Sequence, residues 1–201
     1  MLTLERPVDL ARVRTLAGEE ILFAEGTRPV ALYQVQAGWI KLVRSSSTGR
    51  DTITDLLFPG DIFDLPSLLD GQSYLMRASS LSGGLAQVRC YDRQRALADH
   101  DLLALAQSQC MERMRFQRRM MAAMATERVE HRALMALSML AERGGRLKFN
   151  MPLTRQEFGE WIGTTTETAI RTLSELRRRG CLSEDHGTIT LSPCPGSTRA
   201  A

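Results

Sequence analysis

The strongest constraint in this sequence is a change in composition that divides it into two kinds of chain. Residues 85–143 contain no glycine and no proline and are dominated by Ala, Leu, Met, Arg, Gln and Glu. These residue types favour helices, so most of this stretch is predicted to be helical. Before it, short apolar runs alternate with glycine and proline, a pattern typical of strands joined by turns.

The N-terminal strands are predicted at regular intervals, which indicates an antiparallel sandwich or barrel. Turn sequences such as Glu25-Gly26 and Pro59-Gly60-Asp61 separate them. The predicted strands are residues 21–23, 31–35, 39–44, 52–58 and 87–91.

One face of the helical stretch carries a heptad pattern, with residues recurring in alternating steps of four and three. This pattern predicts contact between two copies of the helix, and packing of the helix on its own domain is the alternative. A second helix is predicted to begin at Thr126, whose hydroxyl would cap it, and to end at Gly144-Gly145. The heptad positions are Leu103, Gln107, Cys110, Met114, Gln117, Met121 and Met124.

Residues 153–191 contain the most informative pattern. Thr154 and Glu157 form a capping box, so a helix begins there, and Gly163 ends it after about two turns. A second helix is predicted to open within Thr164-Thr165-Thr166 and to stop at Gly180. Two short helices joined by a tight glycine turn are a helix-turn-helix.

Helical periodicity assigns Ala169, Leu173 and Leu176 of the second helix to the core. The opposite face can enter a major groove, where Arg171 can bond guanine, Glu167 cytosine and Ile170 a thymine methyl. An ordinary solvated helix with a Glu–Arg pair is the alternative. The exposed face is predicted to consist of Thr166, Glu167, Ile170, Arg171 and Ser174.

The segment after the second helix favours DNA binding over an ordinary solvated helix. Three arginines, 177–179, precede a predicted hairpin with a turn at Asp185-His186-Gly187, which is the wing of a winged helix. Residues 112–180 carry a net charge of +6 and residues 1–111 a net charge of −2. A basic second half indicates a polyanionic partner.

Other functional classes have little support. The four cysteines are scattered, so we expect reduced thiols and no metal site, with a redox-sensing thiol at Cys90 or Cys110 as the alternative. No nucleophile–base arrangement, acid pair or phosphate loop indicates an enzyme. No apolar run is long enough to span a membrane, and charges interrupt residues 1–16, so we expect a cytoplasmic protein with no membrane partner.

With this order of motifs, the chain resembles the cyclic-AMP receptor protein and fumarate–nitrate reduction regulator family. Residues 153–163 and 166–173 are similar to its helix-turn-helix, and residues 18–26, 32–33, 38 and 59–61 to its β-roll. The resemblance implies an α+β fold: an antiparallel, jelly-roll-like β-roll of the cyclic-nucleotide-binding type, a long dimerisation helix and a winged helix-turn-helix. The implied ranges are 1–95, 96–125 and 126–192, followed by a disordered tail over 193–201.

The resemblance also implies partners and site residues. It implies a homodimer that binds double-stranded DNA and acts on RNA polymerase. By position, Glu167 and Arg171 resemble the base-contacting pair, and Arg155 and Thr165 resemble phosphate contacts. The implied dimer contacts are Leu103, Cys110, Met114, Gln117, Met121 and Met124.

The sequence departs from the family at the residues that bind the signal molecule in the cyclic-AMP-binding members. Cyclic-AMP-binding members have a Gly-Glu pair for the ribose and an Arg-Ser pair for the phosphate. Here these places hold residues 63–66 and Tyr74-Leu75, so cyclic AMP is disfavoured. An iron–sulfur cluster is disfavoured because no cysteine precedes Cys90. The expected effector pocket consists of Phe63, Asp64, Leu65, Tyr74 and Arg77.

Several alternatives stay open for the signal. The first is a ligand that is not a cyclic nucleotide, the second is haem or redox chemistry, and the third is that the protein has no effector at all. His100 and His131 are the candidate haem ligands. A cyclic-nucleotide-binding or haem- and redox-sensing module that acts through protein contacts is the rival function. Such a module would explain the β-roll but leave the helix-turn-helix and its wing without a purpose.

Overall fold

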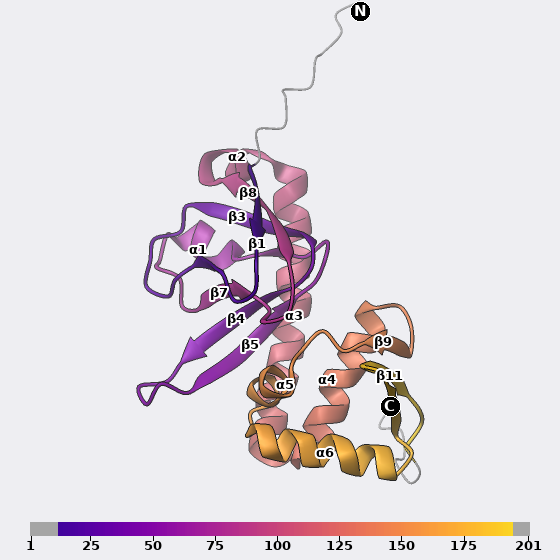
Figure 1. The fold of residues 1–201 in the computed structure, drawn as a ribbon. Coiled ribbons are helices and arrows are strands. Elements are labelled where there is room, and N and C mark those ends of the chain that lie inside the picture. Colours follow the sequence, from indigo (N-terminus) through magenta and orange to yellow (C-terminus); the bar gives the residue numbers. More distant parts are fainter. Residues whose placement is uncertain (1–11, 195–201) are drawn as a thin grey trace, which may run out of the picture.

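A computed structural model describes residues 12–194 of the chain (Figure 1). A β-roll is followed by one long helix, and a compact domain of helices and a small sheet lies at the far end of that helix. The predicted tail over 193–201 lies, from residue 195 on, outside the described residues, as do the first eleven residues of the predicted β-roll.

The β-roll consists of two antiparallel four-stranded sheets that enclose an apolar core. One sheet has the order β1 (Arg12–Leu16), β8 (Ala86–Asp92), β3 (Ala31–Ala37) and β6 (Ile62–Phe63). The other has the order β2 (Ile21–Phe23), β7 (Arg77–Ser80), β4 (Ile40–Ser45) and β5 (Asp51–Leu57). The antiparallel prediction is confirmed, and β1, β6 and β7 are strands that the sequence pattern did not reveal.

Three helices pack against the β-roll, of which the first lies between β6 and β7 in the chain and the other two follow β8. The short helices α1 (Leu65–Asp70) and α2 (Arg93–Ala98) pack beside it, and α3 (His100–Thr126) runs along its side (Figure 1). Asp99 caps α3 by accepting a hydrogen bond from the amide of Leu102. The cap predicted at Thr126 was wrong: Thr126 ends α3, and its hydroxyl donates back to the carbonyl of Ala122.

The C-terminal domain begins with α4 (Val129–Arg143), whose first residue follows Arg128 without a side-chain cap. Helices α5 (Arg155–Trp161) and α6 (Thr166–Arg178) form the predicted helix-turn-helix. Strands β10 (Leu182–Asp185) and β11 (Thr188–Leu191) form the predicted wing. A third strand, β9 (Lys148–Asn150), pairs with β11 and was not predicted.

The prediction of four reduced thiols was wrong for two of them. The structure joins Cys181, at the start of the wing, to Cys194 in a disulfide, whereas Cys90 and Cys110 are free. The pairing of β10 with β11 brings the two cysteines together, although they lie 13 residues apart in the sequence.

The β-roll and the C-terminal domain share one apolar core, in which Val43 and Leu56 join Leu137 and Trp161. Two ion pairs accompany this contact. Lys41 of β4 donates to Glu157 of α5 at 2.9 Å, with both side chains almost fully buried. Arg143 of α4 donates to the buried Asp61 at 2.8 Å. The helix-turn-helix is therefore held in one position against the β-roll.

Glu157 accepts several hydrogen bonds at this contact. Burial disfavours its charged form, but hydrogen bonds from Lys41, Thr154 and Ser82 outweigh this effect and lower the pKa of Glu157 to about 2. The carboxylate is thus fully ionised at neutral pH and matches the charge of Lys41.

We expect Lys41→Met to destabilise the protein by about 3–5 kcal/mol, because it leaves the Glu157 carboxylate buried without a counter-charge. Lys41→Met combined with Glu157→Gln should recover part of this loss, since Gln can still complete the capping box. Urea unfolding measures both free energies. Arg44→Met, which breaks the exposed pair with Glu25, is the control and should cost less than about 1 kcal/mol. A single variant as stable as the double variant would contradict the prediction.

Candidate DNA-binding surface and ligand cavity

The turn between α5 and α6 is tight because two glycines permit it. A Cβ at Gly159 would lie 3.2 Å from the carbonyl oxygen of Thr165, so a larger residue here would push the start of α6 away from α5. Gly163 has a φ of +69°, a conformation that glycine adopts without strain. Thr165 then caps α6 by accepting from the amide of Thr168.

The faces of α6 match the helical periodicity of the sequence. Ala169, Leu173 and Leu176 are buried, whereas Ile170 is 47 % exposed. The predicted groove-facing residues Glu167, Arg171 and Ser174 are also exposed, and Thr166 is half-buried. Hydrogen bonds from its own amide and from the Thr165 hydroxyl hold the pKa of Glu167 below its usual range, so this side chain is an ionised acceptor.

The two predicted phosphate contacts differ in their exposure and in whether the side chain is already bonded. Thr165 is exposed at the start of α6. Arg155 lies at the start of α5 and pairs with Glu184 of the wing, while its Nη1 atom is buried without a hydrogen-bond partner. This pairing links α5 to the wing.

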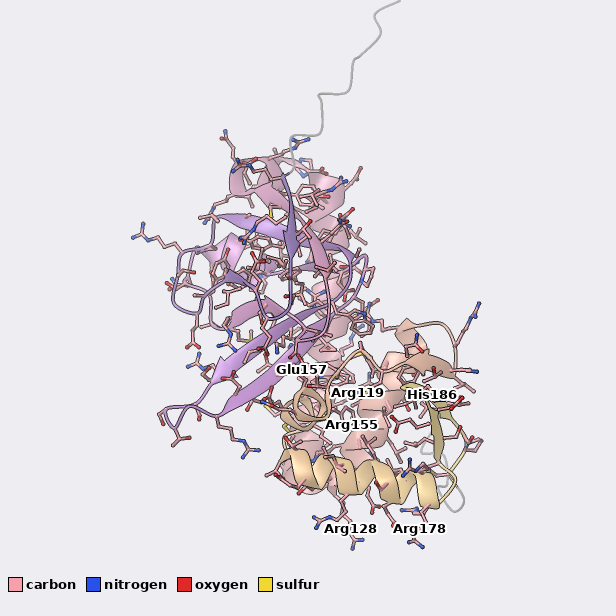
Figure 2. The ribbon with its side chains drawn as sticks, in the orientation of Figure 1. Arg119, Arg128, Arg155, Glu157, Arg178 and His186 are labelled. Atoms are coloured by element: carbon pink, nitrogen blue, oxygen red, sulfur yellow. A yellow bond between two sulfur atoms is a disulfide. The ribbon has the colours of Figure 1, made fainter. Side chains whose placement is uncertain are left out.

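Two further arginines are candidate phosphate contacts: Arg178, which ends α6 and belongs to the arginine run 177–179, and Arg128, which the sequence analysis did not single out. Figure 2 shows Arg128 and Arg178 projecting on the outer side of this helix, away from the β-roll. Arg128 is exposed, and Arg178 is paired with Glu175 on the same helix. Residue 128 precedes α4, so no periodic pattern of α6 could have indicated it.

The heptad positions of α3 do not share one environment. Leu103 packs against the β-roll, and Cys110, Met114 and Gln117 line a cavity beside it. Towards the end of the helix, Met121 is 67 % exposed and Met124 is 37 % exposed. The first heptad positions therefore face the β-roll of the same chain, whereas Met121 and Met124, at the end of the helix, stay partly exposed.

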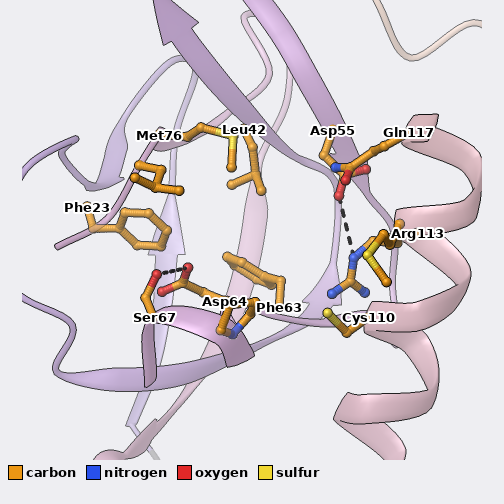
Figure 3. Close-up of a pocket in the computed structure, with 13 residues that line it drawn as sticks. Phe23, Leu42, Asp55, Phe63, Asp64, Ser67, Met76, Cys110, Arg113 and Gln117 are labelled. Carbon is orange, nitrogen blue, oxygen red and sulfur yellow. Dashed lines mark hydrogen bonds and ion pairs between the residues drawn. The ribbon is translucent and has the colours of Figure 1, made fainter. Parts of the chain in front are cut away.

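The cavity lies between the β-roll and α3 and has a volume of about 210 Å³ (Figure 3). Strands, the α1 segment and α3 all contribute to its walls. Its lining residues are Phe23, Leu42, Asp55, Phe63, Asp64, Pro66, Ser67, Leu75, Met76, Cys110, Arg113, Met114 and Gln117.

Of the expected pocket residues, Phe63 and Asp64 line this cavity. Leu65, Tyr74 and Arg77 do not, and that expectation is corrected. Leu65 is the first residue of α1 and is buried in a separate apolar cluster. The Tyr74 ring stacks on Phe23, and its hydroxyl accepts from the amide of Val30. Arg77 of β7 pairs instead with Asp51 of β5, across the intervening strand β4, at 2.8 Å.

The sequence analysis missed Arg113, which supplies a cation to the cavity from α3. Its Nε lies 3.4 Å from the carboxylate of the buried Asp55. Burial raises the pKa of Asp55 to about 6, although the Arg113 charge and a hydrogen bond from the Leu56 amide act in the opposite direction. Position 113 precedes a heptad position by one residue, and the packing of α3 against the β-roll places it opposite Asp55 of β5.

Asp64 carries the other polar group of the cavity. Its backbone is left-handed, with a φ of 68°, and one carboxylate oxygen accepts from Ser67 at 3.0 Å. The second oxygen is buried and has no hydrogen-bond partner. Burial raises the pKa of Asp64 to about 7 against the opposing effect of the Ser67 hydrogen bond.

Two further findings concern metal binding and membrane spanning. Within residues 12–194, no group of three or more His, Cys, Asp or Glu side chains is placed to hold a metal ion. Among the described helices, none is long and apolar enough to cross a membrane.

Family models match both parts of the chain. The model of a cyclic nucleotide-binding domain matches residues 13–97, and that of a Crp-like helix-turn-helix domain matches residues 127–193. A β-roll of this type joined to a winged helix-turn-helix defines a DNA-binding transcription regulator. The chain belongs to the cyclic-AMP receptor protein and fumarate–nitrate reduction regulator (CRP/FNR) family.

Individual relatives agree with this assignment. The chain is 25 % identical over 203 residues to a CRP-like cAMP-activated global transcriptional regulator of Mycobacterium tuberculosis, covering 98 % of this chain and 88 % of the relative. It is 25 % identical over 166 residues to the nitrogen fixation regulation protein FixK of Rhizobium meliloti, covering 83 % and 75 %. The FixK2 structure from Bradyrhizobium japonicum superposes with a TM-score of 0.77 at 24 % identity, covering 92 % and 93 %, and shows the same fold.

The raised pKa of Asp64 predicts a pH dependence of stability. Because the folded chain binds this proton more tightly than the unfolded chain, the free energy of unfolding should fall as pH rises from about 4 through about 7. Asp64→Asn should remove this part of the decline, and Asn tolerates the left-handed backbone. Urea unfolding of both proteins at about pH 5 and about pH 8 measures the difference, to which Asp55 contributes equally in both. Identical declines would contradict the prediction.

Proposed function

We propose that this regulator acts as a homodimer that binds an inverted-repeat operator through α6 of each subunit. The observation that carries the proposal is the exposed face of α6, where Ile170 lies uncovered beside Glu167 and Arg171. An exposed isoleucine between two charged groups has no role within the chain, but it fits a groove that offers thymine methyls as well as polar base edges.

The proposed contacts with DNA divide into two kinds. Thr166, Glu167, Ile170 and Arg171 face bases, while Thr165 and Arg155 bond phosphates. Arg155 is bonded to Glu184 and its Nη1 atom is buried, so this side chain would turn away from the wing to bond a phosphate. The exposed Arg128 adds a further phosphate contact, since it projects on the same side as α6.

The proposed dimer contact runs along α3. Met121 and Met124 are apolar and uncovered, and their spacing continues the heptad pattern. Leu103, Cys110, Met114 and Gln117 would extend this contact where they are not engaged with the β-roll. A two-fold dimer places two copies of α6 about one helical turn of DNA apart. Bound at a promoter, the dimer would then act on RNA polymerase.

The cavity beside α3 is the proposed site of the regulatory signal, because α3 connects it to both the dimer contact and the DNA-binding domain. Cyclic AMP is not the proposed signal. Arg77 pairs with Asp51 outside the cavity, and Arg113 is balanced by Asp55, so no uncompensated cation is available for a cyclic phosphate.

We expect Arg171→Ala to weaken operator binding by about 1–3 kcal/mol and to relax selectivity at one guanine position, because two base-specific hydrogen bonds are lost. Binding to a library of operator variants measures both effects. Arg178→Ala is the matched control on the same helix, and it should change affinity uniformly across sequences. An Arg171→Ala protein with unchanged selectivity would show that another face of α6 contacts the bases.

We expect Met121→Asp to convert the protein to a monomer that loses its operator, because a dimer contact would bury two unpaired charges. Sedimentation velocity measures the oligomeric state and a gel shift the binding. Ser108→Asp, at an exposed position of α3 outside the heptad pattern, should leave both unchanged. A Met121→Asp protein that still sediments as a dimer would place the contact elsewhere.

A further inference from the structure

Two residues that line the cavity each have a buried polar atom without a partner, and the roles of these two atoms are opposite. Nη1 of Arg113 is a donor, and the arginine as a whole is only 8 % exposed. Oδ2 of Asp64 is an acceptor whose companion oxygen is already bonded to Ser67. A buried polar atom without a partner costs about 1–3 kcal/mol, so a ligand that offers one acceptor and one donor relieves both costs.

These two atoms come from different walls of the cavity. Figure 3 shows Arg113 reaching in from α3, with its terminal nitrogens on the side of the guanidinium away from Asp55. Asp64 enters from the start of α1, where the hydrogen bond from Ser67 holds its carboxylate. A ligand that bonds both would bridge the β-roll to α3.

The remaining lining is mainly apolar. Phe23 and Phe63 present aromatic rings, and Leu42, Met76 and Met114 complete the walls. The volume of about 210 Å³ exceeds a cavity of about 150 Å³ that holds benzene and lies below the range of about 300 Å³ and more for drug-sized ligands. The part of the ligand inside the cavity is therefore an apolar body of about the size of a single ring.

The charges of the cavity exclude a strongly charged ligand. Asp55 balances Arg113, and Asp64 titrates with a pKa of about 7, so the net charge near neutral pH lies between zero and −1. A buried anion would find no uncompensated cation. A buried cation would face the Arg113 guanidinium as well as the Asp64 carboxyl, and either ion would lose its hydration.

We propose that this cavity binds a small, uncharged, largely apolar molecule that accepts a hydrogen bond from Arg113 and donates one from a hydroxyl group to Asp64. The inference rests on the proposed function in taking the cavity as the signal site, and it adds the chemical class of the signal. Because the ligand bridges the β-roll to α3, its binding would restrict the position of the helix that carries the proposed dimer contact.

Calorimetric titration of the full-length protein at neutral pH with four related aromatic probes tests the class. The uncharged para-hydroxyacetophenone has both a hydroxyl and a carbonyl group, and it should bind with a Kd of about 1 mM or tighter, as expected for a ligand of this size. Replacing the hydroxyl in para-methylacetophenone should weaken binding about tenfold, the cost of one buried hydrogen bond. The anion para-hydroxybenzoate and the cation para-hydroxybenzylamine should also bind at least about tenfold more weakly.

Variants of the protein test the site. Arg113→Met combined with Asp55→Asn removes the donor without leaving Asp55 as an unpaired buried charge, and it should weaken para-hydroxyacetophenone binding about tenfold. Arg119→Met, an exposed arginine on the same helix, is the matched control and should bind as the unchanged protein does. Circular dichroism of each variant verifies folding before titration.

Three results would overturn the proposal: tighter binding of the anion, the cation or cyclic AMP than of para-hydroxyacetophenone; unaltered binding in the Arg113→Met/Asp55→Asn variant; or no saturable binding of the uncharged probe up to about 5 mM. The operator assay is run both without and with saturating probe. A protein that binds the probe but binds no operator in either state would refute the proposed function alone, and a protein that binds its operator but not the probe would refute the ligand class alone.

Discussion

The buried pair of Lys41 and Glu157 is the interaction on which the arrangement of the two domains depends. Glu157 completes the capping box that starts α5 and, with the same carboxylate, accepts from Lys41 in the β-roll. The start of the helix-turn-helix and its position against the sheet are thus fixed by one side chain. Since buried charges are costly when separated, the pair favours this one arrangement over others in which the domains have moved apart.

Helix α3 connects the three properties that a regulator of this class needs. One part of it lines the cavity through Cys110, Arg113 and Gln117, and its last turns expose Met121 and Met124. These methionines, together with Trp161 of α5, also line a second apolar hollow of about 310 Å³. A small displacement of α3 at the cavity therefore changes contacts both at the proposed dimer face and beside the helix-turn-helix, because all of them pack on the same rigid element.

Local sequence signals predicted the DNA-binding part well. The capping box at Thr154, the turn at Gly163 and the apolar spacing of Ala169, Leu173 and Leu176 depend on residues within a few positions of one another. The structure contains each of these features. The helix start at Thr126 was wrong although its signal was also local, because α3 continues to that residue and the hydroxyl bonds back into its own helix.

What the sequence by itself determined is the order of the domains, the antiparallel strands of the N-terminal half, the helix-turn-helix with its wing and the exposed face of α6. Only the tertiary structure decided which side chains line the cavity: it excluded Tyr74 and Arg77, admitted Arg113 from α3, and paired Cys181 with Cys194. The physical reason is the range of the interactions. Caps, turns and periodic faces form between neighbours in the chain, whereas Asp55 meets Arg113 only after the sheet has curved and the long helix has packed across it.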